Sequence, residues 1–180
     1  LILWVFLTAC SPPTPEQVES PITPTATNEA AQPSEPSEAV AAIPLHPVLR
    51  IVDGDTIWVE LDGAEAKIRL LGIDTPEVER DLTPGECYAH EAEDRLREVL
   101  AGKGVMLLAS KTGDQVDQYG RLLRYVFADG EDVNAQLIRE GYAFAFRRYP
   151  HDRRGYYRQL ETEAKQQQTG MWNPQNCSYW

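Results

Sequence analysis

Residues 68–77 read IRLLGIDTPE, an apolar strand sequence that runs into a glycine and then into two acids three residues apart. Arg69 alternates with apolar neighbours, so its side chain leaves the strand on the opposite face. Gly72 weakens the strand there, and the proline between the acids fixes the backbone and cannot donate to a sheet. We therefore expect a rigid strand end that presents Arg69, Asp74 and Glu77 toward one region. A guanidinium near two carboxylates suits a metal-assisted reaction on a phosphate.

The stretch before this strand predicts a hairpin that brings a further acid to the same place. Residues 56–61 alternate between apolar and polar, and the Asp-Gly pair at 62–63 is a strong hairpin signal that returns the chain into 67–71. Asp55 begins the first of these strands, and Asp74 follows the second. Antiparallel pairing places the two positions at the same end of the hairpin, so we expect them to lie close together.

The rest of the chain predicts a mixed, mostly antiparallel structure with helices. Helices are expected from 87 to 102, where Tyr88, Ala92, Leu96 and Leu100 form a buried stripe, and at 133–141 and 157–170. Further strands are expected at 48–52, 105–109 and 121–128, the last one introduced by a Tyr-Gly turn.

Three short motifs carry a resemblance to a known family. DGDT at 53–56, RLLGIDTPE at 69–77 and D-x-YGR at 117–121 occur in the order in which the thermonuclease, or staphylococcal-nuclease-like, family has them. The resemblance covers residues 45–173. It implies an α+β, mainly β, fold: a five-stranded Greek-key barrel of the OB type with three helices.

The resemblance also implies a calcium site. The positions that match the family's ligands are the carboxylates of Asp55 and Asp74 and the backbone carbonyl of Thr75. Oxygen ligands of this kind suit a hard cation. Two carboxylates leave room for water and a substrate phosphate, so binding without substrate should be weak. The alternative for Asp55 is a turn-forming residue whose side chain bonds its own backbone.

The same resemblance assigns roles in catalysis. Arg69 and Arg121 match the two guanidiniums that hold the scissile phosphate, a task to which the planar fork of arginine is suited. Glu77 matches the residue that positions the attacking water and acts as general base. Taken alone, either arginine would more often be a surface or ion-paired residue, but both stand inside intact motifs.

Three aromatic residues are candidates for binding the substrate. Tyr119 matches a tyrosine that bonds a terminal phosphate, although Gln118 replaces the lysine that well-known members carry before it. Phe146 and Tyr149 are candidate base-stacking residues, with the alternative that Phe146 is core. The densest basic stretch is expected beside the cleft, or else on a solvated helix face, and comprises Arg147, Arg148, Arg153, Arg154 and Arg158. The histidines at 46, 90 and 151 show no ligand spacing and are read as surface or core residues.

The N-terminal part differs in composition from the rest. Residues 1–10 read as a truncated lipoprotein signal peptide that ends in a lipobox, Leu-Thr-Ala-Cys, with Cys10 as the lipidated residue. The alternative is a chance cysteine that ends an ordinary secretory segment. Residues 11–44 are rich in Pro, Thr, Ser and Glu without aromatic residues, and predict a disordered tether before a domain at 45–180. We thus expect an extracytoplasmic protein, anchored to the cell membrane or the outer membrane, or else secreted.

Charge and the remaining cysteines narrow the function further. All seventeen Lys and Arg residues and twenty-three of the twenty-eight acids follow residue 44, which leaves the domain near −6. An acidic domain argues against tight, non-specific nucleic-acid binding, but not against a local basic cleft. Cys87 and Cys177 are a candidate disulfide in an exported protein, or else two unpaired thiols. Without CxxC or Cys/His spacing, zinc is not expected.

Together these features favour a calcium-dependent endonuclease that acts as a monomer on DNA and RNA. The resemblance implies 3′-phosphate and 5′-hydroxyl products, with single strands and A·T-rich duplex preferred. The rival hypothesis is a non-catalytic module of the same fold that binds nucleic acid or protein. Such modules typically lose the acidic ligands or the catalytic arginine, and here all of those positions are filled.

Overall fold

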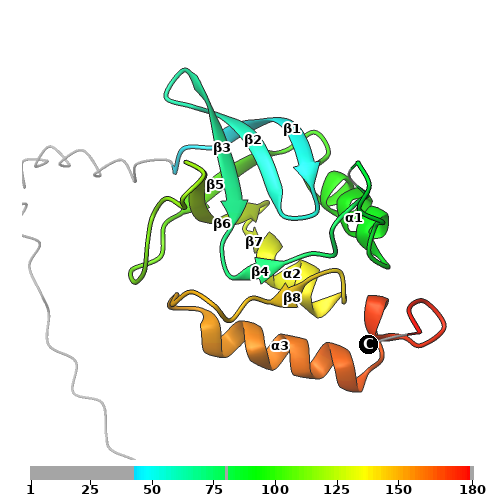
Figure 1. The fold of residues 1–180 in the computed structure, drawn as a ribbon. Helices are drawn as coiled ribbons and strands as arrows, with labels where there is room; N and C mark the ends of the chain where they lie inside the picture. Colours follow the sequence, from blue (N-terminus) through cyan, green and yellow to red (C-terminus); the bar gives the residue numbers. More distant parts are fainter. Residues whose placement is uncertain (1–42, 80, 179–180) are drawn as a thin grey trace, which may run out of the picture. The chain divides into compact units, whose positions relative to one another are not determined.

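A computed structural model describes residues 43–79 and 81–178, which form a strongly bent sheet with three helices (Figure 1). The strands are β1 (His46–Asp53), β2 (Thr56–Leu61), β3 (Ala64–Leu70), β4 (Ile73–Asp74), β5 (Gly104–Leu108), β6 (Leu122–Ala128), β7 (Glu131–Asp132) and β8 (Phe144–Ala145). The helices are α1 (Ala89–Leu100), α2 (Val133–Arg139), α3 (Arg154–Gln166) and the short 3-10 turn η1 (Gly170–Trp172).

The five long strands close into a barrel, as the sequence predicts. Their order is β3-β2-β1-β5-β6, and β3 also pairs with β6, which joins the two ends of the row. This last pairing is parallel, with Ile68 opposite Leu122 and Leu70 opposite Arg124, whereas the others are antiparallel. The predicted α+β, mainly β, barrel of the OB type is therefore confirmed.

The β2–β3 hairpin sets the register on which the rest of the barrel builds. Asp62 and Gly63 both have positive φ, 52° and 78°, the conformation that a two-residue hairpin turn requires. The pairing then runs from Leu61 opposite Ala64 to Thr56 opposite Arg69. The inward-facing residues of both strands are completely buried: Ile57, Val59, Ile68 and Leu70. Alternation in the sequence thus corresponds to the two faces of the sheet.

Helix α1 starts two residues later than the sequence predicts. Tyr88 adopts a left-handed conformation with φ 73°, so the helical backbone begins only at Ala89. The ring of Tyr88 stacks on that of Tyr142 at 5.3 Å between centroids, outside the helix. The predicted stripe is otherwise buried as expected, with Ala92 and Leu96 fully covered and Leu100 nearly so.

Short pairings that the sequence does not reveal position the segments around the strand end. β4 pairs with β8, with Ile73 opposite Ala145 and Asp74 opposite Phe144. This pairing holds the acid-bearing end of the 68–77 stretch against the segment that leads to α3, which packs on α2 and β8 (Figure 1). Two-residue strands carry too little periodicity to be found in a sequence.

Several expectations lie outside the described residues. These are the signal peptide at 1–10 with its lipidated Cys10, and the tether at 11–44 apart from its last two residues. Within the part of the chain that the structure describes, none of the helices combines the length and the apolar character needed to cross a bilayer.

Substitution of Leu96 should show how far the barrel depends on α1. The Leu96 side chain is completely buried, so Leu96→Ala should lower the free energy of unfolding by about 2–5 kcal/mol through lost burial and an unfilled cavity. Leu82 is fully exposed, and Leu82→Ala should change it by no more than about 0.5 kcal/mol. Chemical denaturation of both variants measures this, and equal effects would contradict the packing described.

Candidate active site

The guanidinium of Arg69 lies between two carboxylates at the end of β3. Its Nη2 is 2.9 Å from Oδ2 of Asp55 and 2.6 Å from Oδ1 of Asp74. Its Nη1 donates to the carbonyls of Leu70 at 3.0 Å and Ile73 at 2.9 Å. Because Arg69 is paired with the residue after Asp55 in the hairpin, the strand register itself brings the Asp55 carboxylate and the Arg69 guanidinium together.

Asp55 is the most deeply buried acid of the site, with 5% of its surface exposed. Its Oδ2 accepts hydrogen bonds from the amide and the hydroxyl of Thr75 at 3.2 and 3.3 Å, and its Oδ1 accepts one from Oγ1 of Thr56 at 2.9 Å. Burial raises the pKa of Asp55 to about 7, against the opposing charge of Arg69, and Asp53 raises it further. The cost of removing the charged carboxylate from water therefore outweighs the attraction of Arg69.

The sequence allows a turn-forming role for Asp55, but in the structure Asp53 has that role. The amide of Asp55 donates to Oδ1 of Asp53 at 3.2 Å, so Asp53 holds the β1–β2 turn. The side chain of Asp55 points to Arg69 and Thr75 instead. At the other acid, burial raises the pKa of Asp74; Arg69 opposes this, and the nearby charge of Glu86 adds to it.

The donor set fits a hard cation that is weakly held. Two carboxylates converge on one nitrogen of Arg69, and Thr75 bonds directly to one of them. Excess negative charge on buried oxygen atoms is what a calcium-sized cation would neutralise. Among the described residues, no group of three or more His, Cys, Asp or Glu side chains is placed to hold a metal. Further ligands would therefore have to be backbone oxygens, such as that of Thr75, or water.

Arg121 is held by the turn that precedes β6. Its Nε donates to Oδ2 of Asp117 at 2.6 Å, while Oδ1 of Asp117 accepts the amides of Tyr119 and Arg121, each at 2.9 Å. Gly120 has φ 78°, which allows the chain to turn back between them. One aspartate thus fixes both the backbone of the turn and the direction of the guanidinium, which also lies 5.4 Å from the ring centre of Tyr119.

A single hollow joins the two arginines to aromatic rings. It is lined by Arg69 and Arg121 together with Phe146, Tyr149 and His151. The rings of Phe146 and Tyr149 are 5.6 Å apart between centroids and tilted by 45°. The structure therefore places both predicted stacking residues beside both predicted phosphate contacts. A guanidinium pair flanked by aromatic faces suits a phosphate with an attached base.

The remaining predicted residues lie around this centre. Tyr119 is 74% exposed and borders a neighbouring hollow that Asp117 and Tyr149 also line. Glu77 is exposed on the loop after β4, where its amide donates to the side chain of Glu86 and its carbonyl accepts the amide of Glu86. Cys87 and Cys177 form a disulfide between the start of α1 and the C-terminal segment.

The basic stretch around α3 is not a uniform patch. Arg153 pairs with Asp132 and lies 4.7 Å and 4.9 Å from the ring centres of Tyr125 and Phe127, so it ties α3 to the barrel. Arg147 pairs with Glu161 at 2.5 Å. Arg153 and Arg147 thus share their charge with acids on other elements, and the steering role of the basic stretch stays a prediction.

Sequence reasoning missed the role of His151. The residue is 6% exposed, and its Nδ1 lies 3.1 Å from the hydroxyl of Tyr125, which itself donates to Asp152 at 2.6 Å. The edge of its ring packs against the backbone of Gly72, whose carbonyl accepts the amide of Phe146 at 2.9 Å. Burial lowers the pKa of His151, which favours the neutral ring. No spacing pattern could reveal this contact, since the two partners are far apart in the sequence.

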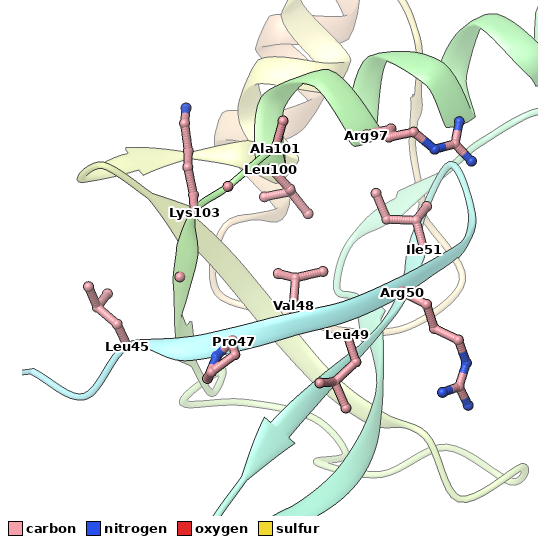
Figure 2. A pocket seen from close by; sticks show the side chains of 12 residues that line it. Leu45, Pro47, Val48, Leu49, Arg50, Ile51, Arg97, Leu100, Ala101 and Lys103 are labelled. Carbon is pink, nitrogen blue, oxygen red and sulfur yellow. The ribbon is translucent and has the colours of Figure 1, made fainter.

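A larger hollow elsewhere contains none of the predicted site residues. It measures about 580 Å³ and lies between β1 and the end of α1 (Figure 2). Val48 and Leu100 point toward one another across it, and Arg50 points away. Its wall is mostly apolar, without a carboxylate among the lining residues, so size alone does not make it the site of phosphate chemistry.

Comparison with known proteins places the site in a family context. Residues 67–174 match the family model described as staphylococcal nuclease homologue. The thermonuclease of Staphylococcus intermedius is 36% identical over 126 residues, which cover 69% of this chain and 74% of that protein. The thermonuclease of Staphylococcus hyicus is 35% identical over 127 residues, covering 70% and 74%. The endonuclease YncB of Bacillus subtilis is 36% identical over 126 residues, covering 69% and 59%.

The contact between Gly72 and His151 can be tested by adding one methyl group. A Cβ at Gly72 would collide with Cε1 of His151 and lie 2.8 Å from its Nε2, whereas a Cβ at Gly63 would meet nothing within 4 Å. Both glycines have φ near +80°, 81° and 78°, so both alanine variants carry the same backbone strain. We expect Gly72→Ala to lower the free energy of unfolding by about 1–3 kcal/mol more than Gly63→Ala.

Chemical denaturation measures the difference, and His151→Ala supplies the second half of a double-mutant cycle. In the Gly72→Ala background the smaller side chain should recover part of the loss. Equal costs for the two glycine variants would mean that His151 does not support the turn after β3.

Proposed function

The chain belongs to the staphylococcal nuclease homologue family, and we propose that it is an endonuclease that hydrolyses phosphodiester bonds of DNA and RNA. One observation carries the proposal: Arg69 contacts two converging carboxylates and shares a hollow with Arg121. The products we propose are 3′-phosphate and 5′-hydroxyl ends.

The two arginines act on the charge of the scissile phosphate. Each guanidinium donates two parallel hydrogen bonds to a phosphate, and such donors matter most where negative charge increases in the transition state. Asp117 orients Arg121 through its Nε. Arg69 is held by four acceptors through its two Nη groups, so a cation that takes over Asp55 and Asp74 would release Nη2 for the phosphate. Preorganised charge of this kind is the largest contribution that a rigid site makes to such a reaction.

We propose calcium as the cofactor, held by Asp55, Asp74 and the backbone carbonyl of Thr75. When bound, the cation would polarise the phosphoryl oxygens and offset the charge of the buried acids. The hydrogen bonds from Thr56 and Thr75 fix the orientation of the Asp55 carboxylate for this purpose.

Glu77 would orient and deprotonate the attacking water. It stands three residues after Asp74 on an exposed loop, where Glu86 bonds both its amide and its carbonyl. A general base needs hydrogen-bond reach to the water that it deprotonates. The connection from Asp74 to Glu77 is short, and Pro76 restricts its backbone.

The substrate preference follows from the aromatic faces. Phe146 and Tyr149 offer stacking surfaces that accept any base, so we propose single strands and A·T-rich, easily opened duplex as substrates. The domain charge near −6 limits non-specific attraction, which leaves the two arginines and the cation as the main contacts to the backbone.

We further propose that the enzyme acts as a monomer outside the cytoplasm, anchored through Cys10 or else secreted. The Cys87–Cys177 disulfide supports this location, because disulfides persist in oxidising compartments. The tether at 11–44 would give an anchored domain reach from the membrane surface.

Cleavage of a quenched fluorescent oligonucleotide tests the proposal directly. The intact protein should release fluorescence with calcium and stop with excess chelator. Arg69→Ala should abolish the signal, and Glu77→Gln should lower the rate by about a hundredfold or more while the oligonucleotide still binds.

Glu91→Gln supplies the matched control, since Glu91 is an equally exposed acid on α1. It should cut at the wild-type rate. Calcium-dependent cleavage that survives in Glu77→Gln would remove Glu77 from the mechanism, and binding without cleavage in the intact protein would favour a non-catalytic module.

Calcium should stabilise the fold most at high pH. The raised pKa of Asp55 means that the fold favours its protonated form: this stability is present below the unfolded value of 3.8 and is lost as the pH rises through about 7. Calcium needs the ionised carboxylate, so the gain in Tm with calcium should grow between about pH 5 and pH 8. Thermal unfolding with calcium and with chelator measures this gain.

Two aspartate variants separate the site from a general effect of pH. Asp55→Asn should lose the pH-dependent gain, whereas Asp62→Asn, at the exposed hairpin turn, should keep it. A gain of the same size in all three proteins would place the calcium elsewhere.

A further inference from the structure

Glu86 holds the backbone of Glu77 through two hydrogen bonds. The amide of Glu77 donates to Oε2 of Glu86 at 3.0 Å, and the amide of Glu86 donates to the carbonyl of Glu77 at 2.8 Å. Glu86 thus satisfies both backbone groups of Glu77 across a loop of eight intervening residues. This pair fixes the peptide planes on either side of Glu77, and therefore the direction in which its side chain leaves the backbone.

The loop between these two glutamates has little burial of its own. Every residue from Asp81 to Glu86 is exposed, including Leu82. Glu79 pairs with His90 at 2.8 Å, but both of those side chains are more than half exposed. Exposed pairs contribute little to stability, so the Glu79–His90 pair does little to fix the position of Glu86.

The start of α1 does not supply that fixation by capping. Tyr88 stands at the N-cap position in a left-handed conformation, without a side-chain hydrogen bond to the first turn. The amide of Ala89 instead donates to the carbonyl of Glu86 at 3.3 Å. A helix end without a side-chain cap frays readily unless a tertiary contact holds it.

Cys87 supplies the tertiary contact. It directly follows Glu86 and is bonded to Cys177, 90 residues further along the chain, with 6.0 Å between their Cα atoms. Cys177 is 3% exposed, and its amide donates to the carbonyl of Asn173 at 3.0 Å. The C-terminal segment is itself anchored, since the fully buried Met171 donates its amide to Gly141 at 2.9 Å.

We propose that Glu86 is a positioning residue for Glu77 and that the Cys87–Cys177 disulfide holds Glu86 in place, so that full turnover requires the oxidised protein. The proposal rests on the proposed function for its kinetic part, because Glu77 is there the general base. The phosphate contacts and the metal ligands stand on β3 and β4, in the turn between β1 and β2, and directly beside β4 and β6, outside the loop that ends at Cys87. Loss of the bridge should therefore affect the chemical step and leave substrate binding in place.

The redox step is a simple thiol–disulfide exchange. A dithiol reductant such as dithiothreitol attacks one sulfur of the bridge and then closes on itself, which breaks the S–S bond of the protein. Two electrons and two protons pass to the protein, giving the free thiols of Cys87 and Cys177, and the reductant becomes a cyclic disulfide.

The test compares three variants of the whole chain with the wild type. Glu86→Ala removes the acceptor for the Glu77 amide but keeps the bridge. Glu86→Gln keeps an acceptor oxygen and removes the charge. The double variant Cys87→Ser with Cys177→Ser removes the bridge and keeps the acceptor. Glu91→Ala serves as a control for the loss of an exposed carboxylate on the adjacent helix.

Two readouts are measured on each protein. Oligonucleotide cleavage with calcium should show kcat lowered by about tenfold to a hundredfold in Glu86→Ala and in the serine double variant, with KM within about twofold. Glu91→Ala should keep the wild-type kcat, and Glu86→Gln should keep most of it, since it loses only the charge of Glu86 near Asp74. Amide hydrogen exchange should show the Glu77 amide protected in the wild type and in Glu86→Gln, and unprotected in Glu86→Ala and the double variant. Dithiothreitol should convert the wild type to the behaviour of the double variant and leave the double variant unchanged.

The exchange readout does not need activity, so the two proposals fail separately. Protection of Glu77 that persists after loss of Glu86 or of the bridge overturns the positioning role. Protection that changes as expected in a protein without any cleavage supports the positioning role and overturns the proposed function. A fall in kcat in Glu86→Gln equal to that in Glu86→Ala would also overturn the positioning role, since the charge of Glu86 rather than its hydrogen bond would then matter. Circular dichroism establishes that each variant is folded.

Discussion

The buried contact of Arg69 with Asp55 and Asp74 is the constraint on which the rest of the molecule depends. Burying a carboxylate is costly unless a cation and hydrogen bonds compensate it, and here Arg69, Thr56 and Thr75 together supply part of that compensation. These partners come from β2, β3 and the residues after β4, so the network forms only when the hairpin has its correct register. A shift of the strand register by one residue would turn the Arg69 side chain toward the core. The Asp55 carboxylate would then lose its guanidinium partner.

The same contact also explains how the Arg69 guanidinium, which helps to hold the fold, could take part in binding a phosphate. The guanidinium meets both acids through Nη2, while Nη1 bonds to backbone carbonyls. Burial raises the pKa of Asp55 to about 7 although Arg69 lowers it, and the charge of Asp53 contributes to the rise. A cation that enters this site would bind the carboxylates that Arg69 now contacts. The guanidinium could then bind a phosphate. The stability of the fold and the binding of a cation therefore depend on the same buried carboxylates.

The sequence predicted those features that local patterns encode. The Asp-Gly turn at 62–63, the alternation of residues 56–61 and the stripe along α1 are each readable within a dozen residues, and they led to the correct barrel class. The three motifs located the arginines and the acids. What the sequence could not show are pairs that meet only in space: the parallel closure of β3 on β6, Gly72 against His151, and Arg153 on Asp132. The left-handed Tyr88 was missed for the same reason, since tertiary contacts override its tendency to join the helix.

The site is divided between a rigid barrel and two loops, and each loop has its own means of fixation. Barrel positions are held by the sheet and the core, where local opening costs nearly the whole stability of the fold. The loop that carries Arg121 is organised by Asp117, which accepts two amides and the guanidinium within five residues. The loop that carries Glu77 is longer and exposed. Its acceptor, Glu86, is held in turn by the disulfide at the next residue, Cys87. The difference follows from length: ordering a loop costs more entropy as more residues are fixed, and a link to a distant buried segment reduces that cost most effectively.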